Sequence, residues 1–212
     1  MNRSEWLAAR KNGIGASEAA CIVGLSPFKT NVQLWEEKTG RREAPDIYDN
    51  PRVKYGTEAE EYLRALFALD FPEYEVTYDQ FGMISNNLDL PFAFATLDGD
   101  LTDKATGSRG VLEIKTAEIN RMGQWAEWGD QMPQHYYVQV CHQLLTTGYD
   151  FAVLKAQIKH TGKDGRPCFT TRHYFMERKD LLPDMDWLAE REIRFWECVK
   201  NDRRPDLILP EI

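Results

Sequence analysis

The chain has 212 residues, of which 42% are hydrophobic and 28% are charged. These proportions are those of an ordinary globular protein and argue against a disordered or fibrous chain, and the length indicates one domain. Lysine and arginine total 26 against 34 aspartates and glutamates, which gives a formal net charge of −8. This balance disfavours binding to nucleic acid through overall positive charge, but it leaves room for local basic patches and for an acidic metal site.

The sequence carries no sign of a membrane or secreted protein. No uncharged apolar stretch approaches the roughly 18–20 residues that span a bilayer, and residues 1–6 lack the apolar core of a signal peptide. We therefore expect a cytoplasmic location and no membrane partner. The cysteines are widely spaced, at Cys21, Cys141, Cys168 and Cys198. Without a C-x-x-C pair they predict free, mostly packed thiols rather than a zinc site or a disulfide framework.

The first third of the chain predicts helices separated by turns. Helices are expected over 4–10, 17–23 and 31–38, with Gly24 and Gly40 ending the second and the third. Residues 13–15 predict a flexible turn, and the segment 41–51, with its prolines, aspartates and asparagine, predicts an exposed loop. The clearest amphipathic helix is expected over 56–69.

The remainder of the chain alternates strands and helices. We expect a strand or hairpin over 74–84, strands over 92–101 and 110–115, and a helix over 134–147 that ends at Gly148. Two more strands follow over 151–158 and 169–175, and a long amphipathic helix covers about 179–200. This order predicts an α/β (α+β) fold, with a mixed β-sheet flanked by helices in a single domain.

The chemically informative residues lie on two of the predicted strands. Asp98 belongs to the first, and Glu113-Ile114-Lys115 lies on the second. Side chains alternate along a strand, so Glu113 and Lys115 share one face while Ile114 points to the core. Buried charges are costly unless they are paired or bind a metal. Asp98 and Glu113 are therefore candidate ligands of Mg²⁺ or Mn²⁺, and Lys115 is placed to hold or deprotonate a water and to stabilise a phosphoryl group. The alternative is a solvated ion pair between Glu113 and Lys115 on an outer face.

These residues resemble the D…(D/E)-x-K signature of the PD-(D/E)XK, restriction-endonuclease-like nucleases. The resemblance is closest to the phage lambda exonuclease and YqaJ-type viral recombinase branch. It spans residues 6–143, and its motifs occur in the family's order. The matching stretches are Trp6-Leu-Ala-Ala-Arg10 with Ile14-Gly-Ala-Ser-Glu18, Gly56-Thr-Glu-Ala-Glu60, Ala95-Thr-Leu-Asp-Gly99 and Tyr136-Tyr-Val-Gln139-Val-Cys-His-Gln143.

The resemblance implies a catalytic centre with Mg²⁺, two ions per site in the family's pattern, and with Mn²⁺ as a substitute. Asp98 and Glu113 match the family's metal ligands, and the carbonyl oxygen of Ile114 matches a further one. Lys115 matches the catalytic lysine. Glu60 matches an acidic helix residue that serves the second metal. Taken alone, Glu60 has the alternative of a solvated helix face.

The resemblance also implies residues that handle the DNA end. Gln139 matches a glutamine that orients the lysine or the water. Arg10 and Ser17 match residues that hold a 5′-terminal phosphate, which suits a guanidinium and a hydroxyl near a helix N-terminus. Lys29 is expected to contact DNA, and Val53 lies where the family inserts an apolar wedge. The alternatives are a surface polar position for Gln139, a surface arginine for Arg10 and a helix cap for Ser17.

Two departures from the family pattern are visible. Cys141 stands where a second glutamine is often found, so the role of that glutamine is absent or taken by Gln143. Some related nucleases carry an iron–sulfur cluster, and Cys198 alone cannot supply the cysteine set that such a cluster needs.

The activity implied is that of a Mg²⁺-dependent exonuclease that digests one strand of double-stranded DNA from its 5′ end. It would release mononucleotides and leave 3′ single-stranded tails for recombination by strand annealing. Implied partners are 5′-phosphorylated duplex ends, a phage single-strand annealing protein and two further copies in a homotrimeric ring. We divide the chain into an N-terminal helical region (1–53), a nuclease core (54–176) and a C-terminal helix (177–212). The alternatives are an endonuclease or nickase on the same fold, and a catalytically dead module that binds DNA ends.

Overall fold

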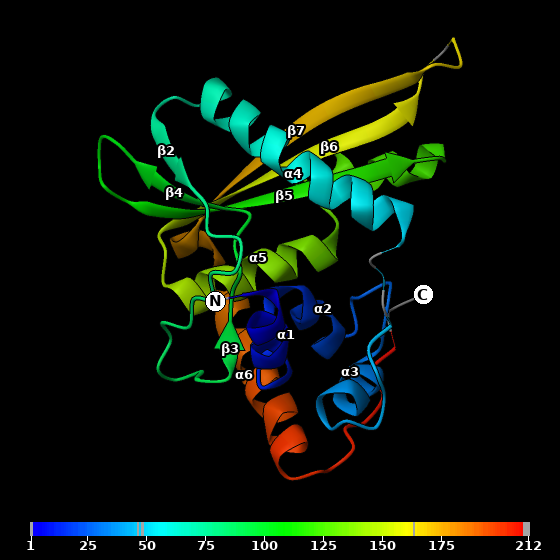
Figure 1. Cartoon of the computed structure of the whole chain (residues 1–212), viewed down its shortest axis with the longest axis vertical. Helices are drawn as coiled ribbons and strands as arrows, with labels where there is room; N and C mark the ends of the chain where they lie inside the picture. The colour runs from blue at the N-terminus through cyan, green and yellow to red at the C-terminus, as the bar shows by residue number, and fades with distance from the viewer. Residues whose placement is uncertain (1, 46, 48, 163, 210–212) are drawn as a thin grey trace.

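The computed structural model describes residues 2–45, 47, 49–162 and 164–209, which form a mixed sheet flanked by helices (Figure 1). The helices are α1 (Arg3–Lys11), α2 (Ala16–Ile22), α3 (Asn31–Lys38), α4 (Pro51–Asp70), the 3₁₀ helix η1 (Met122–Trp128), α5 (Gln134–Thr147) and α6 (Arg178–Lys200). The strands are β1 (Ile14–Gly15), β2 (Tyr74–Thr77), β3 (Ala93–Phe94), β4 (Gly99–Asp103), β5 (Arg109–Ile119), β6 (Phe151–Thr161) and β7 (Pro167–Glu177). The predicted fold class is confirmed.

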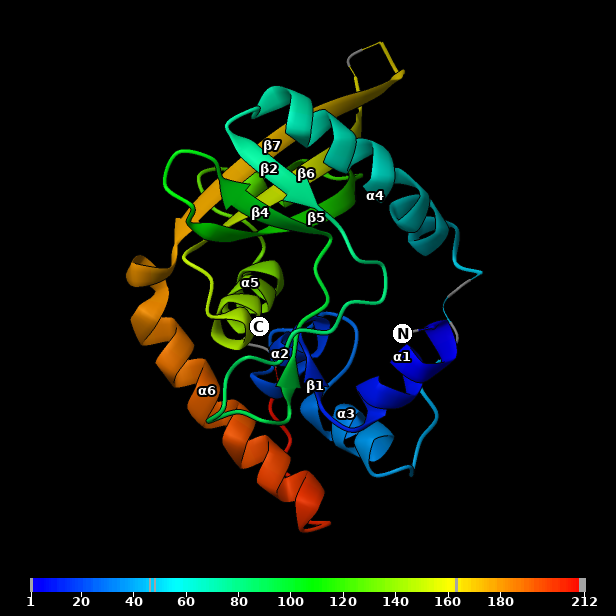
Figure 2. The same cartoon turned by 60° about the vertical axis from the view of Figure 1, so that its left-hand side comes forward.

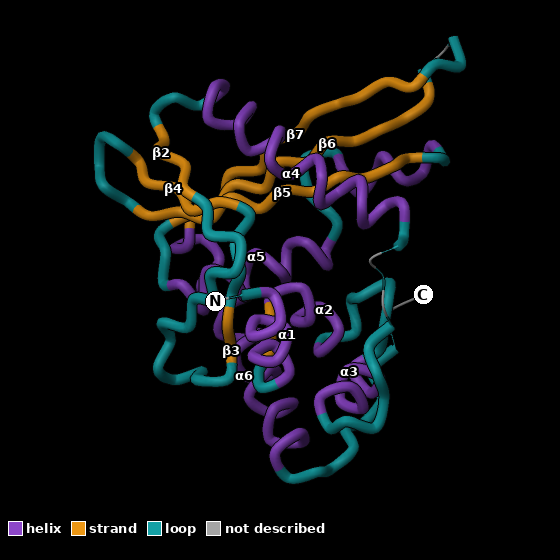
Figure 3. The backbone as a smooth tube through the Cα atoms, viewed as in Figure 1, coloured by secondary structure: helices purple, strands orange, loops and turns teal. Residues whose placement is uncertain are grey.

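The main sheet has five strands in the order β2-β4-β5-β6-β7. Strands β5 and β6 are parallel, and the other three pairings are antiparallel. A parallel pair needs a crossover connection, which η1 and α5 provide here. The β6–β7 ribbon extends beyond the rest of the sheet, as the orange strands of Figure 3 show.

The two faces of the sheet are covered by different helices. Leu63 and Phe67 of α4 pack with Leu112 and Ile114 on one face. On the other face α5 packs against a cluster that includes Val111. Even-numbered residues of β5 therefore face α4, whereas odd-numbered residues from 111 to 115 face α5. This alternation buries the carboxylate of Glu113 under α5, at 2% exposure.

Helix α2 lies against α5 and α6, and α3 lies against α6, on the side of α5 away from the sheet (Figure 2). The short strand β1 pairs in parallel with β3, so residues about 80 positions apart lie side by side. Glycine is required here because the backbone runs close to its partner. A Cβ at Gly13 would lie 2.3 Å from the carbonyl oxygen of Phe92, and one at Gly15 would lie 2.9 Å from the ring of Phe94.

Most helices lie where the sequence predicts them. Helices α3 and α5 match the expected ranges, and each has an end marked by a local signal. The side chain of Thr30 caps α3, and Gly148 ends α5 with a φ of 75°. Helix α4 begins five residues earlier than expected, since Asn50 caps it and Pro51 occupies its first turn.

Three local predictions are wrong. The expected strand over 92–101 is divided into β3 and β4, which belong to different sheets. The expected strand or hairpin over 74–84 is β2 alone, and Ile84 forms an isolated bridge with Ala95. The expected turn at 13–15 contains β1. In each case a partner distant in sequence decides the local structure, which periodicity alone cannot reveal.

The remaining expectations concern cysteines, membranes and subregions. Among the described residues all four cysteines are free, and three of them are buried. The helices of the described chain include none that is long and apolar enough to cross a bilayer. The division of the chain at residues 53 and 176 stays a prediction.

Candidate active site

Asp98, Glu113 and Lys115 meet where β4 begins beside the middle of β5. Gly99, the first residue of β4, pairs with Leu112, so Asp98 lies next to the following residues of β5. Its Oδ2 accepts a hydrogen bond of 2.8 Å from the backbone N–H of Ile114. Lys115 forms an ion pair with Glu113, as expected for side chains on one face of a strand. The structure thus brings the three predicted residues together.

Two glutamines of α5 hold the carboxylate of Glu113. Gln139 Nε2 donates to Oε1 at 2.6 Å, and Gln143 Nε2 donates to Oε2 at 2.5 Å. Glu113 is only 2% exposed, so the outer-strand alternative is wrong for this residue. The alternative of a surface polar position is wrong for Gln139 as well. Gln143 is fully buried, and its Oε1 has no hydrogen-bond partner among the described residues.

Helix α4 contributes Glu60 and Arg64, one turn apart. Glu60 is half-buried and lines the same cleft as Lys115. Arg64 donates a hydrogen bond to the backbone carbonyl of Asp98. Its guanidinium lies 3.6 Å from the ring centroid of Tyr78, a cation–π arrangement that fixes its direction. Arg64 therefore ties α4 to the loop that presents Asp98.

Three carboxylates crowd this site and disfavour one another's charge. Burial, followed by the charge of Glu113, raises the pKa of Asp98 well above its ordinary value. The same two causes raise the pKa of Glu60. Buried acids that repel each other are stabilised by a cation, and a set of carboxylate oxygens is the ligand type that hard divalent ions prefer.

Lys115 supplies positive charge to this group. Burial alone would lower its pKa, but the charges of Glu113 and Asp98 raise it above the ordinary value. The lysine is therefore an ammonium in this state. It can hold a water or stabilise phosphoryl charge, but it cannot accept a proton until the carboxylates are neutralised.

The donor set suits Mg²⁺, although the present arrangement is not a finished metal site. Within the described part of the chain no group of three or more His, Cys, Asp or Glu side chains is arranged to hold an ion. Glu113 is instead engaged by Lys115 and the two glutamines. Both carboxylate oxygens of Glu113 are thus engaged within the protein, Oε1 by Lys115 and Gln139 and Oε2 by Gln143.

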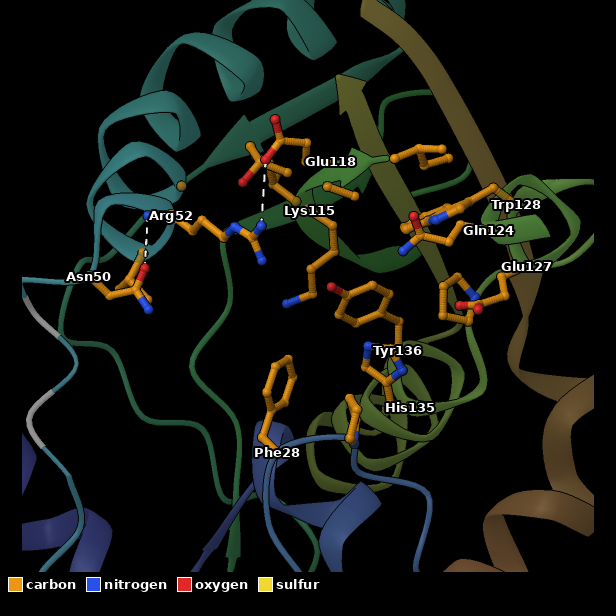
Figure 4. Close-up of a pocket in the computed structure, with 18 of the residues that line it drawn as sticks. Phe28, Asn50, Arg52, Lys115, Glu118, Gln124, Glu127, Trp128, His135 and Tyr136 are labelled. Carbon is orange, nitrogen blue, oxygen red and sulfur yellow. Dashed lines mark hydrogen bonds and ion pairs between the residues drawn. The ribbon is translucent and has the colours of Figure 1, made fainter. Parts of the chain in front are cut away.

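A cleft of about 560 Å³ leads to Lys115 and Glu60. The C-terminal half of β5 forms its floor. Its walls come from the start of α4, from η1, from the start of α5 and from the loop at Pro27 and Phe28. Figure 4 shows Lys115 reaching into this cleft between Arg52 on one side and Tyr136 on the other. Of the carboxylates and the lysine described above, Glu60 and Lys115 line this cleft directly.

Arg10 and Ser17 come together as the resemblance predicts. Arg10 Nη2 lies 3.5 Å from Ser17 Oγ, and the guanidinium stacks over the rings of Trp6 and Phe94. Burial lowers the pKa of Arg10 from its ordinary value, and the charge of Glu18 opposes this shift. Gly15, not Ser17, is the cap residue of α2, so the helix-cap alternative for Ser17 is wrong. The Ser17 hydroxyl instead accepts a hydrogen bond from Arg10.

The other two predicted DNA contacts differ from each other. Val53 lines the cleft and is half-buried. Lys29 forms an ion pair of 2.5 Å with Glu37, so its charge is already matched within the protein. The DNA-binding role of both residues stays a prediction.

Several residues of the site were not singled out from the sequence. Arg64 looked like a solvated charge on an amphipathic helix, and η1 had no periodic pattern. Tyr136 was part of a motif without a role of its own, and its ring lies 5.1 Å from Lys115 Nζ. For Gln143 the sequence did offer a signal. It follows Gln139 by four residues, so both side chains lie on the same face of the helix.

Comparisons with known proteins agree with this architecture. Residues 5–150 match the model of the YqaJ-like viral recombinase domain. The uncharacterized protein YqaJ of Bacillus subtilis is 30% identical over 201 residues, covering 92% of this chain and 56% of YqaJ. The uncharacterized protein R354 of Acanthamoeba polyphaga mimivirus is 27% identical over 155 residues, which are 69% of this chain and 27% of R354. The chain thus spans about half or less of these relatives.

Solved structures share the fold. An alkaline exonuclease, LHK-Exo, from Laribacter hongkongensis has a TM-score of 0.66 at 21% identity, covering 94% of this chain and 93% of its own. A phage-related exonuclease from Haemophilus somnus 129PT has a TM-score of 0.57 at 11% identity, covering 90% and 96%. On the match over residues 5–150, the chain belongs to the family of YqaJ-like viral recombinase domains.

Proposed function

We propose that this protein is a Mg²⁺-dependent exonuclease that degrades one strand of double-stranded DNA from its 5′ end. The observation that carries the proposal is the grouping of Asp98, Glu113 and Lys115, with Lys115 lining a cleft. Membership in a viral recombinase family and a fold shared with exonucleases support the same class of reaction.

Asp98 and Glu113 would hold the catalytic ion, with Glu60 serving a second ion. In a strand, the N–H and C=O of one residue point to the same side, so the carbonyl of Ile114 faces the side where its N–H meets Asp98. That carbonyl is a further candidate ligand. When bound, the ion supplies Lewis-acid charge and a more acidic water. Mn²⁺ meets the same ligand requirements and would substitute.

The remaining residues orient the reacting groups. Gln139 and Gln143 fix the carboxylate of Glu113, and Arg64 fixes the backbone of Asp98. Lys115 would direct its ammonium at the scissile phosphate, where it stabilises the charge that develops in the transition state. Neutralising the carboxylates would remove what raises its pKa and leave the effect of burial, which lowers it.

The Arg10–Ser17 pair would bind the 5′-terminal phosphate and so set the direction of digestion. Products would be mononucleotides and a 3′ single-stranded tail suited to recombination by strand annealing. A homotrimeric ring around DNA and a phage single-strand annealing protein are the partners that we propose. A ring would let the acidic chain present local basic residues to DNA while its other faces remain negative.

The proposal is tested with linear duplexes that carry a label at the 5′ or the 3′ terminus, beside covalently closed circles. We expect Mg²⁺-dependent loss of the 5′ label with circles untouched. EDTA should stop the reaction, and Mn²⁺ should restore it. Cutting of circles would favour the endonuclease or nickase alternative. Binding to ends without any digestion would favour a catalytically dead module.

A further inference from the structure

Phe28 is an aromatic side chain that the nuclease chemistry leaves without a role. It is 81% exposed and lies in the loop between α2 and α3, at the rim of the cleft. Single exposed apolar residues are common and need no explanation by themselves. Phe28 differs because it lines the cleft and its ring points toward Lys115 and Tyr136, as Figure 4 shows.

Aromatic rings run from Phe28 to the catalytic lysine along one wall. The ring of Phe28 meets His135 edge-on, with centroids 6.2 Å apart. The ring of His135 lies 4.0 Å from that of Tyr136, which in turn lies 5.1 Å from Lys115 Nζ. Burial, with the nearby charge of Lys115, lowers the pKa of His135 to about 4. At neutral pH the His135 ring is therefore uncharged, so Phe28, His135 and Tyr136 present neutral ring surfaces.

The opposite wall has a different character. It is formed by the start of α4, where Asn50 and Arg52 line the cleft, and Arg52 is 3.7 Å from Glu118. A nucleotide has the same two characters, an aromatic base and an anionic phosphate. Aromatic side chains bind bases of any sequence by stacking, whereas phosphates are bound by cations and metal ions.

We propose that Phe28 and His135 form a nucleobase-binding subsite for the terminal nucleotide of the strand that is cut. The inference rests on the proposed function, because it assumes that the scissile phosphate lies at Lys115. Stacking of the terminal base on Phe28 would hold it away from its complement and keep the adjacent phosphodiester at the carboxylates. Every base has a π face, so the subsite would accept all four bases.

The direct test is photocrosslinking of a duplex with 5-iodouracil at its terminal nucleotide, in Ca²⁺ in place of Mg²⁺. We expect the crosslink on Phe28 or His135 and its loss in Phe28→Ala. Phe28→Ala should also weaken DNA-end binding and raise KM, each about fivefold or more, with kcat changed less. Phe28→Trp should restore both, and Phe169→Ala, at an exposed phenylalanine of β7, should change neither.

A duplex whose terminal nucleotide lacks a base provides the second arm. On this substrate the wild type should show the same weakening of end binding and the same rise in KM that Phe28→Ala shows on the normal duplex. Phe28→Ala itself should bind and digest the two substrates equally well. A crosslink elsewhere, or equal KM values for wild type and Phe28→Ala, would overturn the subsite. The subsite would also be overturned if Phe28→Ala changed only the sedimentation of the protein, because Phe28 would then be a contact between protein chains. If the wild type digests no DNA, the proposed function fails, while crosslinking and binding still decide whether the base stacks here.

Discussion

Helix α5 carries two buried polar networks that differ in charge balance. Toward the sheet, Gln139 and Gln143 hold Glu113 within a group of three carboxylates and one lysine, and this network opens to the cleft. On another face of the helix, His142 Nδ1 pairs with Glu192 of α6 at 2.7 Å, and its Nε2 lies 3.1 Å from the carbonyl of Phe94.

The second network is closed and balanced. His142 and Glu192 are both fully buried, with one acid for one base. It joins α5 to α6 and to β3, so its role is to hold elements together. The comparison teaches that buried charge alone does not mark a functional site. An excess of buried negative charge beside an open cleft is the better indicator, because such an excess is stabilised by a ligand of positive charge.

The largest expected effect is on catalysis. Lys115→Ala and Asp98→Ala should each lower cleavage by at least about 10²–10³-fold, because the first removes the ammonium at the reacting phosphate and the second removes a ligand of the ion. DNA-end binding should stay largely intact. The measurement is the initial rate of digestion beside an end-binding assay. Near-normal Mg²⁺-dependent digestion by either variant would refute the chemistry assigned to the open network.

The closed network should matter for stability instead. His142→Leu leaves Glu192 buried without its partner and should lower the free energy of unfolding by about 3 kcal/mol or more. The double variant His142→Leu/Glu192→Met should recover much of this loss, since an apolar pair replaces both charges. Activity per folded molecule should change little in the double variant. Denaturant unfolding and active-site-normalised rates test both parts.

The opposite stability effect is expected in the open network. Asp98→Asn keeps an acceptor for the N–H of Ile114 but removes a buried charge that Glu113 repels. The metal-free protein should therefore gain about 1 kcal/mol while losing activity. Thermal unfolding in EDTA measures this gain in stability. A clear loss of stability would mean that the carboxylates are not in conflict.

Removal of the phosphate site should alter preference rather than chemistry. Arg10→Ala should reduce the preference for 5′-phosphorylated over 5′-hydroxyl ends by about tenfold, the scale of one charge-assisted hydrogen bond. Lys11→Ala, at an exposed neighbouring cation, is the matched control. An unchanged ratio of the two rates in Arg10→Ala would remove the phosphate-binding role.

The smallest effects are in the pH dependence of stability without metal. Asp98 has a raised pKa when folded, so its contribution is present at low pH and is lost as pH rises from about 4 through the folded pKa. Burial alone would lower the pKa of His142, but Glu192 raises it, so its contribution is lost as pH rises from about 6.5. Asp98→Asn should reduce the change in stability with pH above about 4, and His142→Leu should reduce the change above about 6.5. The measurement is the melting temperature of each variant and of the wild type across this pH range. An unchanged dependence of melting temperature on pH in either variant would contradict the assignment.

The sequence predicted the elements that carry local signals. Caps and glycines mark the ends of α3 and α5, and the spacing of Glu113 and Lys115 places both on one face of a strand. The division between β3 and β4 could not be predicted locally, because it depends on bridges to Ile84 and β1. That division matters for the site, since Asp98 lies in the break rather than within a strand.

Contacts across elements explain what was missed in the site. Nothing near Arg64 in the sequence indicates that it reaches the carbonyl of Asp98, and nothing near Glu192 indicates His142 as its partner. The motif did place Gln139 and Gln143 on one helix face. Only the packing of α5 on β5 shows that both donate to the same carboxylate.

The most direct test of the account is crystallographic, with Mn²⁺ added and anomalous scattering recorded. We expect a Mn²⁺ peak between Asp98 and Glu113, with carboxylate oxygens about 2 Å away and the ion pair of Glu113 with Lys115 opened. Ordered density for both carboxylates with no Mn²⁺ between them, at concentrations that support digestion, would contradict the central claim.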